Sequence, residues 1–282
     1  MAILFALCSA ALFGAMTTFI RRALDRGADA EEGAVAAVLI AFLIALPVAV
    51  VAAAWPGPAR LGATWPFVLA GILSPGIAQI FVTLALRDAG ASRTSIAFGT
   101  APLVSVVLAL TLLAEPLSAP LLVGAVLIVA GGLALAAERD RPEHIRPIGL
   151  VYALVGVALF ASRDNLLRWL ARHDAPVAPA SAAVTLGIGV IVTLAWLRRF
   201  PSSRSLRAFT PGGGAFGLSY LCLFEAYYRG RVTVVSPLVA TESLWGVLLA
   251  ATLLRHTELV GRRLVMGALL VVAGGALIGA FR

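Results

Sequence analysis

Long apolar stretches follow one another along almost the whole chain, separated by short connections rich in Pro, Gly and Arg. Each stretch is close to the roughly 20 residues that a helix needs to cross the hydrocarbon core of a bilayer. Their length and continuity exclude the short alternating strands of a membrane β-barrel. The pattern predicts an all-α integral membrane protein of about ten transmembrane helices. The runs lie near residues 2–20, 33–54, 65–86, 94–113, 119–137, 148–169, 177–197, 212–229, 232–254 and 264–281.

The composition agrees with a membrane protein and argues against a soluble one. Of the 282 residues, 61% are hydrophobic and 13% are charged, and the mean hydropathy is +0.98. A soluble domain of this size has no core large enough to bury so much apolar surface. The formal net charge is +8, but the arginines lie mostly in the connections, as topology signals and contacts for lipid phosphates. The lipid bilayer, and no nucleic acid, is therefore the predicted partner.

No pattern of catalytic residues accompanies the spans. The three histidines lie in connections, and the sequence contains no HExxH motif, nucleophile elbow or phosphate-binding loop. Cys8 and Cys222 lie far apart inside apolar runs, which favours neither a disulfide framework nor a zinc site. We therefore expect no enzymatic activity, no cofactor and no metal ion.

The second half of the chain repeats the first. The segment ALFGAMTTFIRRAL (11–24) is similar to ALFASRDNLLRWL (158–170), with Phe13 aligned to Phe160 at a shift of 147 positions. Residues 115–132 and 258–275 both place a Gly nine positions after a Glu, and a Gly pair sixteen positions after it. Spans one to five are thus echoed by spans six to ten, which divides the chain into repeats at 1–140 and 141–282.

An odd number of spans in each repeat has a physical consequence. The second repeat enters the bilayer from the opposite side, so the two repeats are inverted relative to each other. Inverted repeats recur in secondary transporters, whose substrate site lies near the membrane midplane between the two halves. The sequence therefore predicts two inverted five-helix repeats with a site where they meet.

The paired blocks at 115–132 and 258–275, the segment APLVSVVLALTLLAE (101–115) and the tandem five-span layout resemble the EamA-like branch of the drug/metabolite transporter superfamily. The resemblance covers essentially the whole chain, and its motifs carry no information about the substrate. It implies a ten-span permease that exports or imports metabolites by alternating access, with both termini in the cytoplasm. The chain departs from the family pattern at 36–42, which is all apolar where an Arg is often found, and at Glu242, near the position matching Pro102.

The distribution of arginines implies the opposite orientation. Connections 1–2, 3–4, 5–6, 7–8 and 9–10 hold 15 arginines, whereas the other face of the membrane holds 6. Because cytoplasmic loops carry an excess of Arg and Lys, this count places both termini outside the cytoplasm. The orientation, and with it the direction of transport, stays open at this stage. The expected location is the cell membrane, as a multi-pass protein of a prokaryotic inner membrane.

Charged side chains inside the spans are costly in lipid, so each is a candidate for the functional site. Glu242 lies near the middle of the ninth run, and Arg163 and Glu225 lie past the middle of the sixth and eighth. Because the sixth and eighth runs have the same direction, Arg163 is predicted to meet Glu225 or Glu242 in the interior. Arg163 either holds a substrate carboxylate or forms a purely internal ion pair. Glu242 and Glu225 either bind a substrate amine or carry a coupling proton. Alternatively, Glu242 has a purely structural role, as a buried protonated carboxyl or in an internal ion pair.

Uncharged polar and aromatic residues complete the predicted substrate site, namely Trp245, Tyr228, Tyr220, Gln79 and Asn165. The first two share the helix faces of Glu242 and Glu225 by their spacing of three positions, and they are predicted to form an aromatic wall. Tyr220 and Gln79 are related by the repeat at a shift of 141 positions, and Asn165 is a candidate to hydrogen-bond a ligand.

Three further residues are assigned to the edge of the membrane. Asp164 and Arg168 are four positions apart near the end of the sixth run, which favours a snorkelling ion pair. Tyr227, at the end of the eighth run, is predicted to be an interfacial anchor.

Pro75 falls inside the third run and is predicted to kink its helix.

Together these observations predict a secondary transporter that moves a small metabolite by alternating access, with proton coupling as an option. An amino acid or another polar organic solute fits the charged residues, as a small-molecule substrate. The alternatives are a flippase for a lipid-linked substrate and a membrane-embedded enzyme. We expect the chain to act as a monomer or a homodimer.

Overall fold

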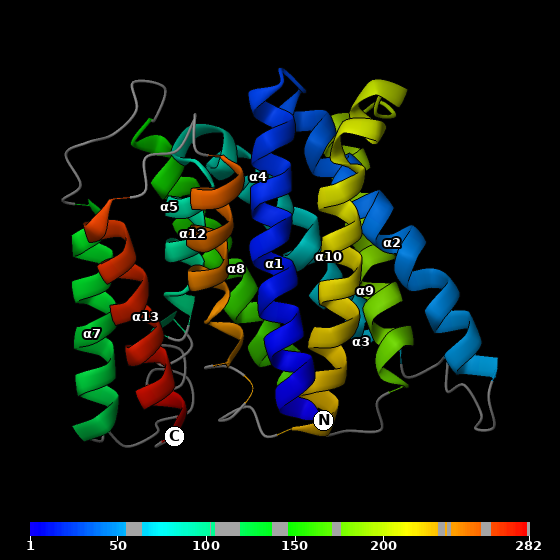
Figure 1. Cartoon of the computed structure of the whole chain (residues 1–282). Helices are drawn as coiled ribbons and strands as arrows, with labels where there is room; N and C mark the ends of the chain where they lie inside the picture. The colour runs from blue at the N-terminus through cyan, green and yellow to red at the C-terminus, as the bar shows by residue number, and fades with distance from the viewer. Residues whose placement is uncertain are drawn as a thin grey trace.

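The computed structural model consists of long helices that run roughly side by side (Figure 1). The structure describes residues 1–54, 64–101, 103–104, 119–136, 146–170, 176–230, 235, 238–254 and 261–280. Within this part of the chain every regular element is a helix, which confirms the predicted fold class. The elements are α1 (Ala2–Asp25), α2 (Ala30–Ala54), α3 (Pro66–Gly71), η2 (Ile72–Ile77), α4 (Ala78–Ala89), α5 (Ala91–Phe98), α7 (Ala119–Ala136), α8 (Ile148–Leu170), α9 (Ala178–Leu197), α10 (Ser203–Arg229), α12 (Glu242–Leu253) and α13 (Arg262–Ala280).

Each of the ten predicted spans coincides with helix in the described residues. The third span consists of α3, η2 and α4 in succession, and the fourth is described mainly at its start, by α5. Five segments of the described chain are long and apolar enough to cross a membrane: α1, α2, the stretch from α3 to α4, most of α8, and α9. The repeat blocks that begin at Glu115 and Glu258 start outside the described residues.

The two ends of the bundle differ in charge. α1 begins and α13 ends at the same end of the bundle, which we call the terminal end (Figure 1). The connections α1–α2, α4–α5 and α9–α10 lie at the opposite end, which we call the arginine-rich end. An even number of spans brings both termini to one end, as the sequence pattern predicts.

Contacts between helices occur in the couples that a two-fold relation between the repeats requires. α1 packs against α10 and α12, and its counterpart α8 packs against α4 and α5, their respective counterparts. The contacts α2–α9, α5–α12 and α7–α13 each join a helix to its own counterpart. α1 runs from the terminal end to the arginine-rich end, whereas α8 runs the other way (Figure 1). The repeats are therefore related by an axis in the membrane plane.

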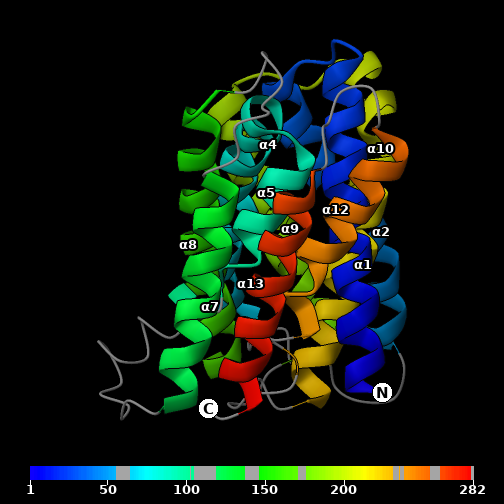
Figure 2. The ribbon, with the colours of Figure 1, turned by 60° about the vertical axis from the view of Figure 1, so that its left-hand side comes forward.

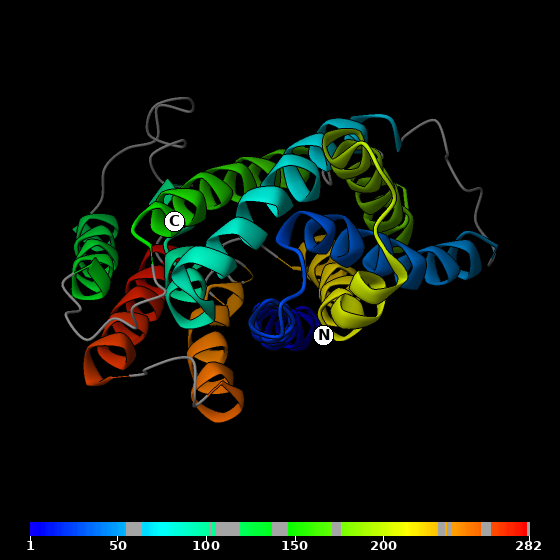
Figure 3. The ribbon, with the colours of Figure 1, turned by 90° about the horizontal axis from the view of Figure 1, so that it is seen from above.

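α7 and α13 form a pair at one edge of the bundle, as Figure 2 and the end-on view in Figure 3 show. A Cβ atom added to Gly131 would lie 2.7 Å from the carbonyl oxygen of Gly267, and one added to Gly274 would lie 2.5 Å from that of Gly124. Glycine at these positions lets the two backbones touch, which is the usual way helices associate in lipid. The repeated glycines thus serve packing between the repeats, away from the centre of the bundle.

The third span is interrupted near Pro75, as predicted. The π-helical segment η2 follows α3, and the backbone of Ser74 leaves the helical region at φ −153° and ψ 122°. Proline has no N–H to donate, and its ring collides with the preceding turn of a helix, so a regular α-helix is not maintained there. The buried Ser74 hydroxyl lies 3.1 Å from the hydroxyl of Tyr220 on α10, which links the two repeats.

α10 begins at Ser203, nine residues before the start that the hydrophobic pattern predicted at 212. Ser202 caps the helix, because its Oγ accepts a hydrogen bond from the backbone N–H of Ser205 at 3.2 Å. In residues 203–210, charged and hydroxyl side chains interrupt the apolar Leu206, Ala208 and Phe209, so the first two turns of the helix lack the continuous apolar run of a span. The connection predicted at 198–214 is correspondingly shorter.

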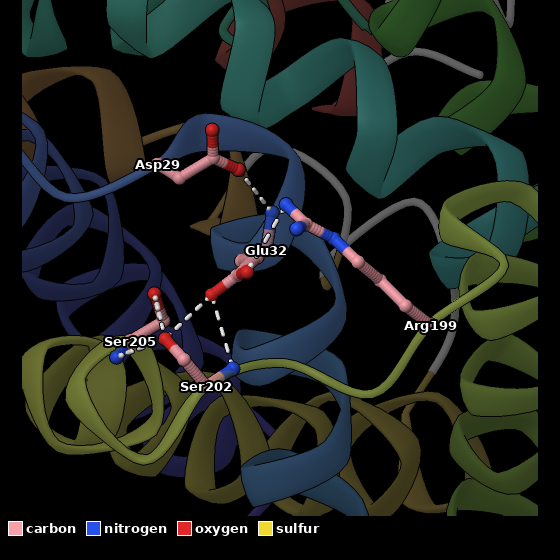
Figure 4. A network of polar contacts seen from close by, with 5 residues as sticks. All are labelled: Asp29, Glu32, Arg199, Ser202 and Ser205. Carbon is pink, nitrogen blue, oxygen red and sulfur yellow. Dashed lines mark hydrogen bonds and ion pairs between the residues drawn. The ribbon is translucent and has the colours of Figure 1, made fainter.

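Glu32 joins the beginning of α2 to the segment before α10 (Figure 4). Its buried carboxylate accepts hydrogen bonds from the backbone N–H of Ser202 at 3.0 Å and from its hydroxyl at 2.7 Å. The guanidinium of Arg199 lies 3.1 Å from the same carboxylate, and Asp29 accepts the backbone N–H of Glu32 at 2.8 Å. Because α2 belongs to the first repeat and α10 to the second, this network ties the repeats together at the arginine-rich end.

Candidate substrate cavity

A cavity lies between the two repeats, where α1, α4 and α5 of the first repeat face α8, α10 and α12 of the second. Aromatic and aliphatic side chains form most of its walls, with a small number of polar groups among them. Its lining is Phe13, Gly14, Met16, Thr17, Val82, Ser95, Phe98 and Ala101 from the first repeat, and Phe160, Arg163, Asp164, Leu223, Tyr227, Val239, Ala240 and Glu242 from the second.

Two equivalent phenylalanines meet at the centre of this cavity. The rings of Phe13 and Phe160, which the repeat aligns, lie 6.4 Å apart in an edge-to-face arrangement. Phe98 packs edge-to-face against Phe160 at 5.4 Å. Because Phe13 and Phe160 are related by the pseudo-two-fold axis and also touch, the axis passes between them. The cavity therefore lies at the interface of the repeats, close to the midplane.

Arg163 is the basic residue among the lining residues, and it is only 1% exposed. Its Nε lies 3.2 Å from Oδ1 of Asp164, and its guanidinium carbon lies 5.2 Å from the ring centre of Phe160 and 4.9 Å from that of Tyr220. An adjacent carboxylate and two aromatic faces reduce the cost of burying the cation. Nη1 has no hydrogen-bond partner among the described residues, so a ligand oxygen can satisfy it.

Glu242 supplies a carboxylate to the same cavity from the first turn of α12. Within the described residues no basic side chain forms an ion pair with it. Asp164 faces the cavity as well, but it is engaged by Arg163. A carboxylate without a basic partner, in a cavity with largely apolar walls, is an attractive site for a cationic group of a ligand.

Two hydroxyl groups form the polar part of the first-repeat wall. Thr17 on α1 donates a hydrogen bond to the carbonyl oxygen of Gly14 at 2.9 Å, and its Oγ1 lies 3.1 Å from Oγ of Ser95 on α5. Gly246 on α12 packs directly against Ser95, so that α1, α5 and α12 converge at this point. Both hydroxyls are neutral, in contrast to the charged groups of the second-repeat wall.

The family comparison agrees with this architecture. A family model described as "EamA-like transporter family" matches residues 1–136 and again residues 147–280. The chain belongs to the EamA-like transporter family. Its two matches correspond to the two repeats, and the family resemblance of the sequence is confirmed. Membership supports membrane transport by a multi-pass integral membrane protein, in a family whose members are generally transporters and not enzymes. The predicted boundary at 140–141 falls between the two matches and stays a prediction.

Comparison with solved structures agrees on the fold. A structure described as "Crystal structure of protein" is 20% identical in sequence, with a TM-score of 0.64. The match covers 98% of this chain and 95% of that one, so the EamA-like fold is shared over its whole length. No curated protein matches this chain.

In this EamA-like transporter, the structure brings Arg163 and Glu242 to one cavity, as the depth of these residues in their spans predicted. The expected meeting of Arg163 with Glu225 is wrong. Glu225 instead forms an ion pair with Arg229, one turn further along α10, at 2.5 Å. Two residues four positions apart on one helix pair locally with little loss of freedom, which keeps Glu225 away from the interior.

Asp164 lies at the cavity and not at the edge of the membrane, where the sequence predicted it. The sequence assigned it to an interfacial pair with Arg168, but it lines the cavity and pairs with the neighbouring Arg163. The side chain of Arg168 lies outside the described residues. The buried cation beside it holds Asp164 in the interior, since an unpaired guanidinium there would cost several kcal/mol.

The two adjacent tyrosines of α10 exchange their predicted places. Tyr227, expected to anchor the membrane edge, is 7% exposed and lines the cavity. Tyr228, expected in the aromatic wall, lies outside the lining and its hydroxyl is 2.8 Å from that of Ser181 on α9. Successive residues of a helix point about 100° apart, so a small error in helical phase exchanges them.

Trp245 also lies outside the lining, because it faces away from the cavity and is 39% exposed. Its backbone contacts α1 at Gly14, and Gly246 follows it. Glycines on both helices let α1 and α12 approach closely, which leaves no room for a bulky ring on that face. The predicted role of Trp245 in the wall therefore does not agree with the geometry.

Three uncharged candidates are not among the described lining residues. Tyr220 is fully buried, stacks against the guanidinium of Arg163 and contacts Ser74, so it supports the site without lining it. Gln79 is buried on α4, and its Nε2 donates to Thr83 at 3.4 Å. Asn165 donates to the backbone carbonyl of Ala161 at 2.8 Å. Whether Tyr220, Gln79 and Asn165 contact the substrate stays a prediction.

Sequence reasoning did not single out Thr17 or Ser95. The signal that could have found Thr17 is the repeat itself, because the alignment of 11–24 with 158–170 places Thr17 opposite Asp164. No comparable signal marks Ser95, whose role depends on how closely α1 approaches α5. Among the described residues no three of His, Cys, Asp and Glu gather as a metal site would require.

Proposed function

We propose that this protein is a secondary transporter that moves a small polar metabolite, such as an amino acid, through the central cavity by alternating access. One observation carries the proposal. Arg163 and Glu242, which have opposite charges and free binding capacity, face the same cavity at the interface of two inverted repeats. The midplane between inverted repeats is where secondary transporters hold their substrates.

The chemistry of the cavity favours a ligand that carries both charges. The guanidinium of Arg163 offers the unsatisfied Nη1 to a carboxylate. Hydrogen bonds between a guanidinium and a carboxylate are charge-assisted and stronger than those between neutral groups. Glu242 offers its carboxylate to an ammonium group. The rings of Phe13, Phe98 and Phe160 provide an apolar surface for the rest of the molecule. An α-amino acid carries both of these charged groups.

Coupling to protons is part of the proposal and falls to Glu242. A carboxylate at this depth, without a basic partner among the described residues, exchanges a proton at lower cost than one held in an ion pair. Glu225, the other predicted carrier, is engaged by Arg229. We propose further that the transporter works in the cell membrane of a prokaryote, as a monomer or a homodimer.

Uptake and efflux in proteoliposomes, over a panel of metabolites with and without a pH gradient, test this proposal. We expect transport of at least one amino acid, and a loss of about tenfold or more in Arg163→Ala and in Glu242→Gln, equal to roughly 1.4 kcal/mol or more. Glu225→Gln is the matched control and should retain most of the activity. Full activity in the first two variants would refute the assignment of the site.

A further inference from the structure

Four couples of lining residues are related by the repeat. The shift of 147 positions relates Phe13 to Phe160, Met16 to Arg163 and Thr17 to Asp164, and all of these line the cavity. The shift of 141 positions relates Val82 to Leu223, which line it as well. The cavity is therefore built around the pseudo-two-fold axis, and equivalent positions of α1 and α8, and of α4 and α10, contribute to its two walls.

The two walls have nevertheless become chemically different. Arg163 and Asp164 of the second repeat correspond to Met16 and Thr17 of the first. Glu242 corresponds to Gly99 at the shift of 143 positions that relates the two glutamates of the repeated blocks. Among the described residues, every charged side chain of the lining belongs to the second repeat, whereas the polar side chains of the first-repeat lining are hydroxyls.

The charged and neutral groups also lie at different depths. Thr17 is one helical turn beyond Phe13 toward the arginine-rich end, and Asp164 is one turn beyond Phe160 toward the terminal end. One turn is about 5–6 Å along the axis, and the two phenylalanines touch at the centre. The charged and neutral sites are therefore displaced in opposite directions along the transport path, with the aromatic rings between them.

The hydrogen bonds fix what the neutral site offers to a ligand. The hydroxyl proton of Thr17 is donated to the carbonyl of Gly14, because a carbonyl oxygen can only accept. The contact between Thr17 and Ser95 must then use the proton of Ser95. Both protons are committed, and the free lone pairs of Ser95 are left to accept a hydrogen bond. The neutral site is an acceptor site.

We propose that Thr17 and Ser95 form a specificity-determining subsite, which selects substrates carrying an N–H or O–H donor at the end remote from the charged groups. The inference rests on the proposed function, and it deepens it by naming the substrate class. A molecule with a charged head and a donor-bearing tail binds in one orientation, with its head on the second-repeat wall and its tail on the first. A tail without a donor leaves the oxygen of Ser95 without a partner once water is excluded.

Matched amino acids that differ in one hydroxyl test the proposal. The pair is tyrosine against phenylalanine, whose side chains reach from the charged site past the central rings, with uptake into proteoliposomes and ligand-induced shifts of the unfolding temperature in detergent as two separate measurements. For the wild type we expect tyrosine to be preferred by about 3- to 10-fold. In Ser95→Ala and Thr17→Val this preference should fall to nearly onefold.

Thr18→Val is the control, because Thr18 is also buried and also donates to the carbonyl of Gly14, at 2.9 Å, but does not line the cavity. It should keep the wild-type preference. Equal preference for both members in the wild type, or an unchanged preference in Ser95→Ala, would overturn the subsite. A preference in the temperature shifts without any uptake would support the subsite and refute transport, so that the two proposals fail separately.

Discussion

Arg163 shows how one residue can be both structural and available to a ligand. Asp164 and the rings of Phe160 and Tyr220 take up part of its surface, and Nη1 remains without a partner in the described residues. The depth of Arg163 and Glu242 in their spans was sufficient to predict that they face the same interior. The places of Asp164 and Tyr227 could not be predicted, because they depend on helical phase and on a neighbour that pairs with them.

Lysine cannot replace Arg163, although it keeps the charge. A planar guanidinium lies against two rings and offers several donors in fixed directions, whereas an ammonium on a flexible stem is a strongly hydrated point charge. We expect Arg163→Lys to lower the initial rate of transport by about tenfold, a change of roughly 1.4 kcal/mol. Arg229→Lys, whose guanidinium is largely exposed, should change the rate by less than about twofold.

Both variants are measured at equal protein per liposome, after confirming that they run as single species in size-exclusion chromatography. Transport by Arg163→Lys at the wild-type rate would show that charge alone is needed at this position. The assignment of Arg163 as a directional donor would then be wrong.

At the level of elements, the apolar runs located the helices within a few residues, since the bilayer imposes one length and one polarity on every span. The beginning of α10 was missed because it is polar, and what holds it is a contact far away in the sequence. Glu32 on α2 binds Ser202 across 170 positions, and no local pattern announces such a partner. The interruption of the third span was predicted correctly, because the cause lies in Pro75 itself.

The network around Glu32 should contribute to stability. Glu32→Ala removes the carboxylate that accepts from the backbone N–H and the hydroxyl of Ser202, and hydrogen bonds to a charged group are worth about 1.5–3 kcal/mol. We expect the unfolding temperature in detergent to fall by about 4–8 °C. Glu31→Ala removes an exposed carboxylate one position away and should shift it by less than about 2 °C. Equal shifts in the two variants would show that the network adds no stability.

The whole molecule is organised by its inversion. Ten spans in two odd-numbered repeats bring both termini to one end, and the contacts between helices occur in the couples that the pseudo-two-fold axis requires. At the centre the two walls differ in chemistry, because the charged lining residues that the structure describes all belong to the second repeat. The same inversion hides the orientation in the bilayer, because an inverted repeat looks nearly alike from both faces and only the connections distinguish them.

The arginine-rich end provides the prediction for orientation. In the sequence, the odd-numbered connections between spans hold fifteen arginines and the other face holds six, which predicts that the arginine-rich end lies in the cytoplasm and both termini outside. In a background with Cys8 and Cys222 replaced by Ser, a cysteine is introduced at Ser203, an exposed position at the arginine-rich end, or at Val177, an exposed position at the terminal end. A membrane-impermeant maleimide should label Val177→Cys in intact cells, and Ser203→Cys only after permeabilisation. The reverse labelling would establish the orientation that the family resemblance implies, and the excess of arginines would then reflect contacts such as those of Arg199 with Glu32.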